Sequence, residues 1–287
     1  GHLFPGLFHA IGNAEVAHVN LPVAVLVIFS FQDGTLPVPP LHGLTWKWYG
    51  EIFADEKLMS ALFNSLIVAI ISSAISCLLG FLAAYAFARY KLPASGLQRA
   101  LIVAPMTVST LIIGLGLLSL LSRLNVSLSL WTVGIGHVVI NLPLCFAIIY
   151  ASMGGHQVNI ERAARDLGAK DWQVMTLVTA PMLMPSILAA FFLSVTFSWD
   201  EFIIAFLLSR FDVTLPVEIW SMLRSGLDPK TNAIGSVVFL ISVAFLVVME
   251  LAVFRKSGKS QGPQPSRSET PRKSSVPSAR STMSRWR

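Results

Sequence analysis

Two adjacent acidic residues, Asp200 and Glu201, stand out chemically because they follow Trp199 inside an otherwise apolar run. A charge at mid-membrane depth costs at least about 2.5–3.5 kcal/mol on insertion scales, so such acids usually face a cavity, a partner helix or a pathway. Two compatible interpretations follow. Either the acids attract a cation and line its path, or the helix breaks near Trp199. In the second case Asp200 caps the next half-helix and Glu201 lies near its positively polarised end.

A second charged segment, residues 160–172, lies between two long apolar runs. Its Ala, Glu, Arg and Leu residues favour a helix, and Gly168 is where that helix should end. A short charged helix between two apolar runs is typical of a segment that a membrane protein presents to a soluble partner. The residues predicted to form this docking segment are Glu161, Arg162, Ala163, Ala164, Asp166 and Gly168.

The fourth apolar run carries two further polar candidates. Asn141 precedes Pro143, which frees a backbone carbonyl that Asn141 could satisfy, unless Asn141 meets a substrate instead. A break or kink of the helix is expected there. His137 is expected to be a buried hydrogen-bond partner between helices, with a proton relay as the alternative.

The remaining reactive residues do not form a catalytic or metal-binding pattern. Cys77 and Cys145 lie in apolar runs as small buried hydrophobes, and the six histidines have no spacing that suits zinc. Gly258-Lys259-Ser260 resembles the end of a phosphate-binding loop, but Val253 occupies the place of its first glycine. We therefore expect no bound cofactor and no enzymatic activity. If the chain works with ATP, the nucleotide and Mg²⁺ bind a separate ATPase.

The composition identifies the class of protein that positions these residues. Of 287 residues, 54% are hydrophobic and 13% are charged, and the mean hydropathy is +0.68. Soluble domains carry about 25% charged residues, so a membrane protein is predicted. The net charge is +6, but residues 255–287 carry +8 and the rest carries −2. The basic character therefore belongs to the tail and does not indicate nucleic-acid binding.

The elements predicted to position the polar residues are membrane-spanning helices, which need about 20 mostly apolar residues each. Six segments qualify or nearly qualify, and the first is short and contains Pro22: 16–31, 62–88, 100–121, 130–150, 182–208 and 233–254. The fold class is therefore an all-α membrane protein with six transmembrane helices. Residues 1–254 form the transmembrane domain, and residues 151–181 form a loop that contains the docking segment.

The orientation depends on the basic residues. With the N-terminus inside, the loops divide their Lys and Arg six against six, and the nine in the tail make the inner side more positive. We expect both termini to be cytoplasmic, which places the docking segment in the cytoplasm. The tail, 255–287, is rich in Ser, Pro and Arg and has few large apolar residues, so disorder is expected.

The loop resembles the EAA loop of permease subunits in ATP-binding cassette (ABC) importers. That pattern is Glu-Ala-Ala, three residues, Gly, nine residues and Ile-x-Leu-Pro. Ala163, Ala164, Gly168 and Pro181 match it. Arg162 stands at the position of the Glu, with Glu161 one place earlier, and Val178 and Ala180 replace the Ile and Leu. Residues 197–210, 214–217 and 224–229 look like the branch that carries spermidine and putrescine.

The resemblance implies a type I ABC importer permease fold in a bacterial inner membrane. It also implies the partners: a cytoplasmic ATPase dimer that receives the docking segment, a second permease subunit that is expected to be a different chain, and a periplasmic solute-binding protein. Within the bilayer, Asp200, Glu201, Trp199 and Asn141 are the candidates for the substrate path.

Three alternatives remain open at this point. The branch also includes importers of other organic amines and of opine-like compounds. A secondary transporter driven by an ion gradient would show paired inverted repeats with coupling-ion residues in both halves, whereas this sequence has one acidic pair. A membrane protein with a structural or assembly role is the third.

Overall fold

The computed structural model describes residues 21, 23–34, 43–226 and 229–257. Across these ranges helices dominate, and the only β pairing is an isolated antiparallel bridge between Gln32 and Leu44. The all-α prediction is therefore confirmed for this part of the chain. Residues 16–20, Pro22, Gly258-Lys259-Ser260 and the tail from 258 lie outside the described residues, so the complete first span and the disordered tail stay predictions.

Three helices are long and apolar enough to cross a membrane alone. They are α3 (Glu56–Arg89), α6 (Leu130–Ala151) and α13 (Pro229–Ser257), and they match the second, fourth and sixth predicted spans. Helix α3 begins six residues before the predicted start because the Asp55 carboxylate accepts hydrogen bonds from the N–H groups of Lys57 and Leu58. Helix α6 runs without interruption through Pro143, so a break there is wrong, while a kink at Pro143 stays a prediction.

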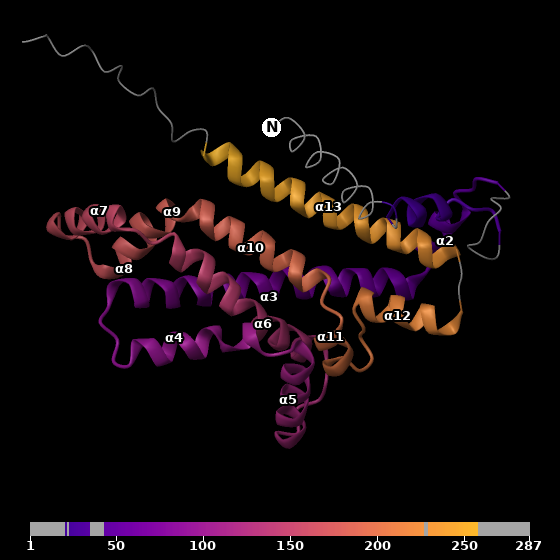
Figure 1. The fold of residues 1–287 in the computed structure, drawn as a ribbon, viewed down its shortest axis with the longest axis horizontal. Coiled ribbons are helices and arrows are strands. Elements are labelled where there is room, and N and C mark those ends of the chain that lie inside the picture. Colours follow the sequence, from indigo (N-terminus) through magenta and orange to yellow (C-terminus); the bar gives the residue numbers. More distant parts are fainter. Residues whose placement is uncertain (1–20, 22, 35–42, 227–228, 258–287) are drawn as a thin grey trace, which may run out of the picture.

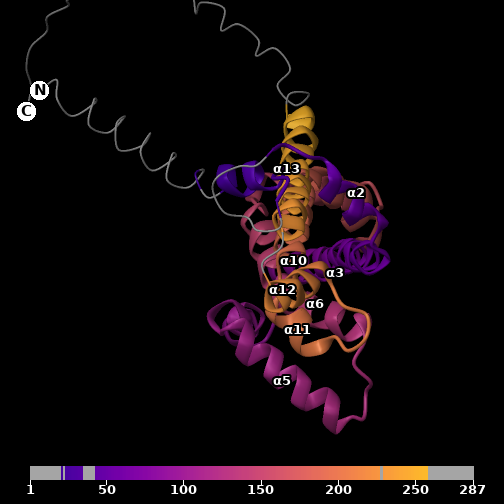
Figure 2. The ribbon, with the colours of Figure 1, turned by 90° about the vertical axis from the view of Figure 1, so that its right-hand side faces the viewer.

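The third predicted span, 100–121, is not one straight helix. It consists of α4 (Ser95–Val103), the 3₁₀ turn η1 (Ala104–Thr107) and α5 (Thr110–Arg123), with a bend of 107° between the two parts. Pro105 lacks the N–H that would continue the helix, and Val108 and Ser109 have extended backbones. Helix α5 consequently projects away from the long helices (Figure 2).

The fifth predicted span, 182–208, is also broken. A short α8 (Asp171–Gln173), the π-helical η2 (Val174–Thr179) and α9 (Ala180–Met182) precede a 73° bend at Leu183. Helix α10 (Met184–Trp199) then ends at the acidic pair, and α11 (Ile203–Leu208) follows. A continuous helix over 182–208 is therefore wrong, and the alternative of a break beside Trp199 is confirmed.

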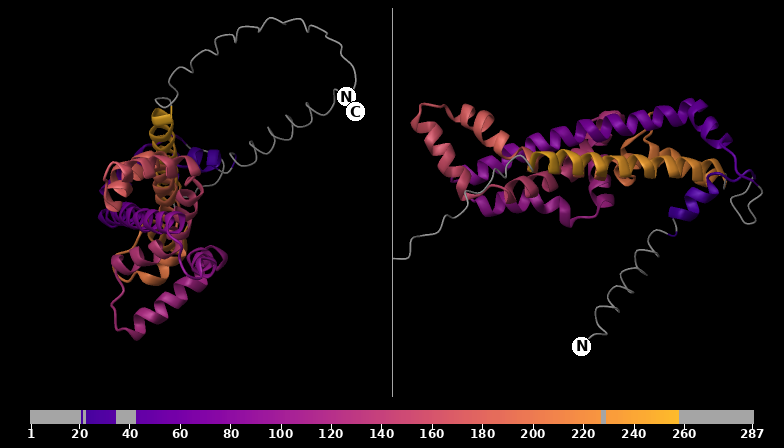
Figure 3. Two further views of the ribbon diagram at one scale, coloured as in Figure 1. Left: turned by 90° about the vertical axis from the view of Figure 1, so that its left-hand side faces the viewer. Right: turned by 90° about the horizontal axis from the view of Figure 1, so that it is seen from above.

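Long helices lie along the longest axis of the molecule, and several short helices lie at each of its two extremities (Figures 1 and 3). One extremity, called the α7 end, holds α7 (Gly155–Asp166), α8 and α9. The other, called the α12 end, holds α2 (Lys47–Ala54) and α12 (Leu215–Ser225). If each bent pair is one span, the described residues contain up to five spans, so the count of six stays a prediction.

Close packing between α3, α6 and α10 joins the two ends. A Cβ added at Gly80 of α3 would lie 2.8 Å from the backbone nitrogen of Phe146, so the helices approach closely there. The Ser198 hydroxyl bonds both Ser72 and His137 Nδ1 between the helices. This confirms His137 as a buried interhelical partner. Cys77 and Cys145 are both buried in the same core, as the sequence predicts.

Candidate functional site

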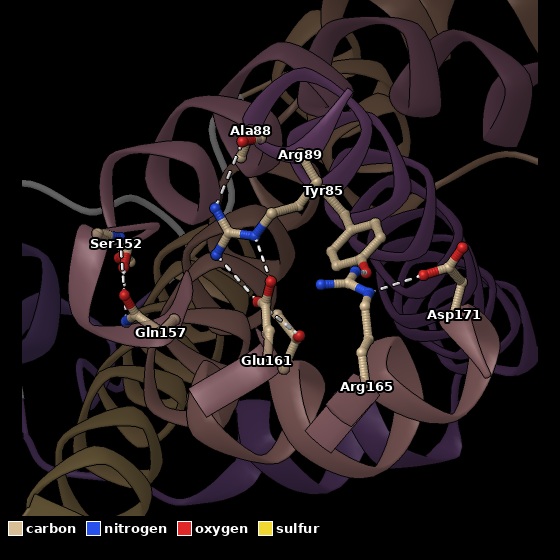
Figure 4. A network of polar contacts seen from close by, with 10 residues as sticks. Tyr85, Ala88, Arg89, Ser152, Gln157, Glu161, Arg165 and Asp171 are labelled. Carbon is tan, nitrogen blue, oxygen red and sulfur yellow. Dashed lines mark hydrogen bonds and ion pairs between the residues drawn. The ribbon is translucent and has the colours of Figure 1, made fainter. Parts of the chain in front are cut away.

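The α7 end contains a buried ion pair centred on Glu161, whose side chain is 0% exposed (Figure 4). Arg89, the last residue of α3, donates Nε–H to Oε2 at 2.6 Å and Nη2–H to Oε1 at 2.9 Å. The Thr179 hydroxyl also donates to Oε1, at 2.8 Å. Glu161 therefore accepts three hydrogen bonds from two other segments, and its charge is matched by a guanidinium in fork geometry.

Local sequence signals define the helix that carries Glu161. At the start of α7 the side chain of Gln157 reaches back, and its Oε1 accepts from the N–H of Gly154 at 2.8 Å. At the end, Gly168 has φ +89°, a left-handed conformation that glycine adopts without strain. The predicted end of the docking helix at Gly168 is confirmed.

Arg165, one turn after Glu161 on the same side of α7, makes a second set of contacts in Figure 4. Its Nε–H donates to Asp171 Oδ1 at 2.9 Å, and Nη2–H donates to the Tyr85 hydroxyl at 3.4 Å. The hydrogen bond to Asp171 raises the pKa of the Arg165 guanidinium above its usual value. Helix α7 is thus held to α8 as well as to α3.

The other side of α7 is open. Arg162, Ala163, Asp166 and Gly168 are exposed, and Ala164 is half-buried, whereas Glu161 points inward. Two large apolar side chains lie among them, Leu167 at 90% exposed and Trp172 at 59%. The α7-end surface comprises Arg162, Ala163, Asp166, Leu167 and Trp172. Sequence reasoning missed the last two, although an apolar residue at the end of a polar helix could have signalled a contact.

At the α12 end, the two adjacent acids have separate roles. Glu201 Oε1 accepts from the N–H groups of Ile203 and Ile204, at 3.0 and 3.1 Å, and so caps α11. The sequence predicted Asp200 as this cap, and the assignment is therefore reversed. Asp200 is exposed, and its carboxylate has no hydrogen-bond or ion-pair partner within the described part of the chain.

A cavity of about 350 Å³ adjoins this unpaired carboxylate. Its lining is mostly aromatic and aliphatic: Trp199, Asp200, Phe202, Leu215, Pro216, Ile219, Trp220, Leu223 and Val238. Trp199 is 2% exposed, and its Nε1–H is unpartnered within the described ranges. A carboxylate beside aromatic faces is suited to an organic cation. Phe202 and Trp220 were not among the predicted site residues.

Asn141, the fourth predicted path residue, does not line this cavity. It is 2% exposed within α6, and its Nδ2 has no partner among the described residues, so it does not satisfy a carbonyl freed by Pro143. Among the residues that the structure describes, no three His, Cys, Asp or Glu side chains are grouped to hold a metal ion. The structure therefore brings together Trp199 and Asp200, leaves Glu201 as a cap and separates Asn141 from them.

Comparisons with known proteins match this architecture. A family described as "Binding-protein-dependent transport system inner membrane component" matches residues 76–257. The spermidine/putrescine transport system permease protein PotC of Escherichia coli K12 is 26% identical over 251 residues, 87% of this chain and 95% of that protein. The putrescine transport system permease protein PotI of the same strain is 32% identical over 225 residues, 76% and 80% of the two chains.

A solved structure extends the comparison to the fold. The chain is similar to one in the crystal structure of a bacterial alginate ABC transporter in complex with an alginate pentasaccharide-bound periplasmic protein. The TM-score is 0.67, the sequence identity is 15%, and the match covers 90% of this chain and 95% of the other. At this identity the likeness supports the fold alone.

Proposed function

Because this chain belongs to the family of inner-membrane components of binding-protein-dependent transport systems, and is a multi-pass permease subunit of an ABC importer, we propose that its solutes are polyamines such as putrescine and spermidine. The observation that carries this proposal is the Asp200 carboxylate, which has no partner among the described residues and lies beside an aromatic cavity. The similarity to PotC and PotI, which are named for these two amines, supports the same substrate class.

The chemistry of the cavity suits such a solute. A polyamine carries ammonium groups separated by methylene chains, so it needs a negative charge and apolar surface at the same place. Asp200 supplies the charge, while Trp199, Phe202 and Trp220 supply aromatic faces that attract cations. With a single carboxylate and an open cavity the site holds the amine weakly, as a transport path requires, and the tight recognition belongs to a separate binding protein.

The proposal includes the partners of the importer. A cytoplasmic ATPase dimer docks on the α7-end surface, where Leu167 and Trp172 offer apolar area and Arg162 and Asp166 offer charges. A periplasmic binding protein delivers the amine at the α12 end, and a second, different permease subunit completes the path. Both termini are then cytoplasmic. ATP and Mg²⁺ bind the ATPase, and this chain holds no cofactor of its own.

In this scheme, ATP-driven closure of the ATPase dimer moves α7, and the path past Asp200 changes between outward and inward access. The energy enters as the different affinity of the partners for the two states of the permease. The amine then passes from the binding protein to Asp200 and onward without covalent chemistry.

Uptake of labelled putrescine and spermidine by cells with and without this chain, their partner genes intact, tests the substrate class. We expect uptake to disappear with the chain and on ATP depletion, and to persist when the ion gradient alone is collapsed. Uptake that follows the ion gradient would indicate a secondary transporter. Unchanged uptake without the chain would exclude polyamines, and opine-like solutes would be screened next.

The docking assignment is tested by Gly168→Pro. Proline fixes φ near −65°, which is incompatible with the φ of +89° at this position, so the α7-end surface should be distorted. We expect loss of ATPase co-purification with normal membrane insertion. The matched control is Gly155→Ala, at a helical position where an added Cβ meets nothing within 4 Å. Equal co-purification of both variants would contradict the assignment.

A further inference from the structure

The buried Glu161 carboxylate bonds both to the last residue of α3 and to the segment leading into α10. Arg89 is the last residue of α3, and Thr179 is the last residue of the π-helical η2. Both donate to Glu161, which lies in the middle of α7 (Figure 4). One carboxylate thus joins the docking helix to the end of one membrane-spanning helix, α3, and to the beginning of the segment that contains α10.

The segment that begins with η2 continues to the cavity, and α3 lies beside it. Helix α9 and the bend at Leu183 connect η2 to α10, which ends at Trp199 beside Asp200. Helix α3 runs along α10, and the pairs Ser72–Ser198 and Ser73–Ser194 hydrogen-bond between them. A displacement of Glu161 therefore reaches the cavity through covalent chain and interhelical hydrogen bonds.

The geometry at Glu161 favours the transmission of movement. The guanidinium of Arg89 binds through two nitrogens, which fixes its direction as well as its distance. A buried ion pair is weak evidence for stability, because desolvation offsets much of its attraction, and a specific arrangement is its better-attested role. The π-helical turn that ends at Thr179 is a rare conformation, and such turns occur frequently at functional sites.

We propose that Arg89, Glu161 and Thr179 form a latch, which makes the α7 docking helix move as one body with the adjoining ends of α3 and η2. Arg89 and Thr179 are then positioning residues for transport, acting through Glu161 without touching the ATPase or the solute. The latch rests on the proposed function, since it transmits the movement that the ATPase imposes on α7. Its loss separates ATP hydrolysis from the opening of the α12 end.

The test uses the assembled transporter, with this chain, the second permease, the ATPase and the binding protein, in proteoliposomes. Thr179→Val removes the hydroxyl donor with little change of shape, and Thr179→Ser restores it. Thr176→Val is the matched control. Thr176 is exposed in the same π-helix, and its hydroxyl donates a hydrogen bond to the backbone carbonyl of Trp172, one turn earlier. Arg89→Gln, which removes the fork, is the second variant.

Two readouts separate the latch from a merely structural role. The first is putrescine imported per ATP hydrolysed. The second is the nucleotide-driven change in distance between spin labels at Phe53→Cys and Phe211→Cys, which are exposed residues at the α12 end, with Cys77 and Cys145 replaced by Ser. The second readout does not depend on the identity of the solute. ATPase co-purification and ATP hydrolysis are measured on every variant.

We expect Thr179→Val and Arg89→Gln to retain the ATPase and its hydrolysis, while transport per ATP and the label displacement fall by at least about five-fold. Thr179→Ser and Thr176→Val should behave as the unmodified chain. Normal transport per ATP and normal label displacement in Thr179→Val would overturn the latch. If Arg89→Gln does not fold, Thr179→Val alone tests the proposal. Failure of the unmodified chain to retain the ATPase would instead overturn the proposed function, and the latch with it.

Discussion

Each end of the molecule holds an acidic residue, yet the two carboxylates differ in burial and in hydrogen bonding. Glu161 at the α7 end is fully buried and accepts hydrogen bonds from Arg89 and Thr179. Asp200 at the α12 end is exposed and has no partner in the part of the chain that the structure describes. A satisfied carboxylate joins helices, whereas an unsatisfied one remains open to a ligand.

The same division separates the neighbours Asp200 and Glu201. The Glu201 carboxylate accepts hydrogen bonds from the first amides of α11, and Asp200 lies beside the cavity. Adjacent residues in a chain point in different directions, so two acids in sequence do not form one site. The environment of each carboxylate, more than its position in the sequence, determines whether it links segments or binds a cation.

The largest effect is expected from breaking the satisfied end. Arg89→Met leaves the Glu161 charge buried without its partner, which typically costs about 3–5 kcal/mol of stability. Thermal unfolding in detergent measures the loss. The matched variant Arg89→Met with Glu161→Met removes both charges and should recover most of the stability. If the single and double variants were equally unstable, the packing of the long Arg89 side chain would matter more for stability than its charge.

The second prediction concerns the packing that connects the two ends. Gly80→Ala places a Cβ 2.8 Å from the Phe146 nitrogen and 2.9 Å from Cys145 Cβ, so α3 and α6 must separate. Overpacking of this kind costs typically about 1–3 kcal/mol. Gly134→Ala in α6 is the control, since nothing lies within 4 Å of its added Cβ. Equal unfolding temperatures of the two variants would indicate that α3 and α6 are not tightly packed at Gly80.

The third prediction contrasts the two adjacent acids. Glu201→Gln weakens the cap of α11 and should lower stability by about 1 kcal/mol. Asp200→Asn removes no bond in the described structure, so stability should be unchanged, while uptake of limiting putrescine falls about ten-fold, or about 1.4 kcal/mol of binding. Unfolding and uptake are measured on both. Full uptake by Asp200→Asn at every concentration would make Asp200 structural.

The sequence predicted the helices that are defined by apolar length. Those over 62–88, 130–150 and 233–254 are present, because burial in a membrane requires about 20 apolar residues whatever their neighbours. The bends at Val108–Ser109 and Leu183 were missed, since an apolar run gives no sign of its direction. The break expected at Pro143 is absent, because α6 continues through this proline.

The candidate site was predictable in its residues and not in its contacts. Glu161 and Asp200 were identified because charges are rare in this chain. Their partners could not be, since Arg89 is 72 residues from Glu161, and the cavity combines α10 and α12 with Val238 of α13. The π-helix before Thr179 likewise has no signal in the sequence. These features depend on tertiary packing, which a single sequence does not specify.

The smallest effect is expected at Asp55, which is paired as Glu161 is but partly exposed. The hydrogen bond from Lys230 is the main cause that lowers the pKa of Asp55, and the amides of Lys57 and Leu58 add to it. Because the pKa is lower in the folded state, the stabilisation is present above about pH 4, the value of an unfolded Asp, and is lost as the pH falls through the folded value. Asp55→Asn keeps a residue that caps α3 well and removes only the charge, so it should cost no more than about 1 kcal/mol at pH 7 and less at pH 2. Denaturation of both proteins at the two pH values measures this difference. A difference of equal size at both pH values would mean that the substitution acts through the cap of α3 and not through the ion pair with Lys230.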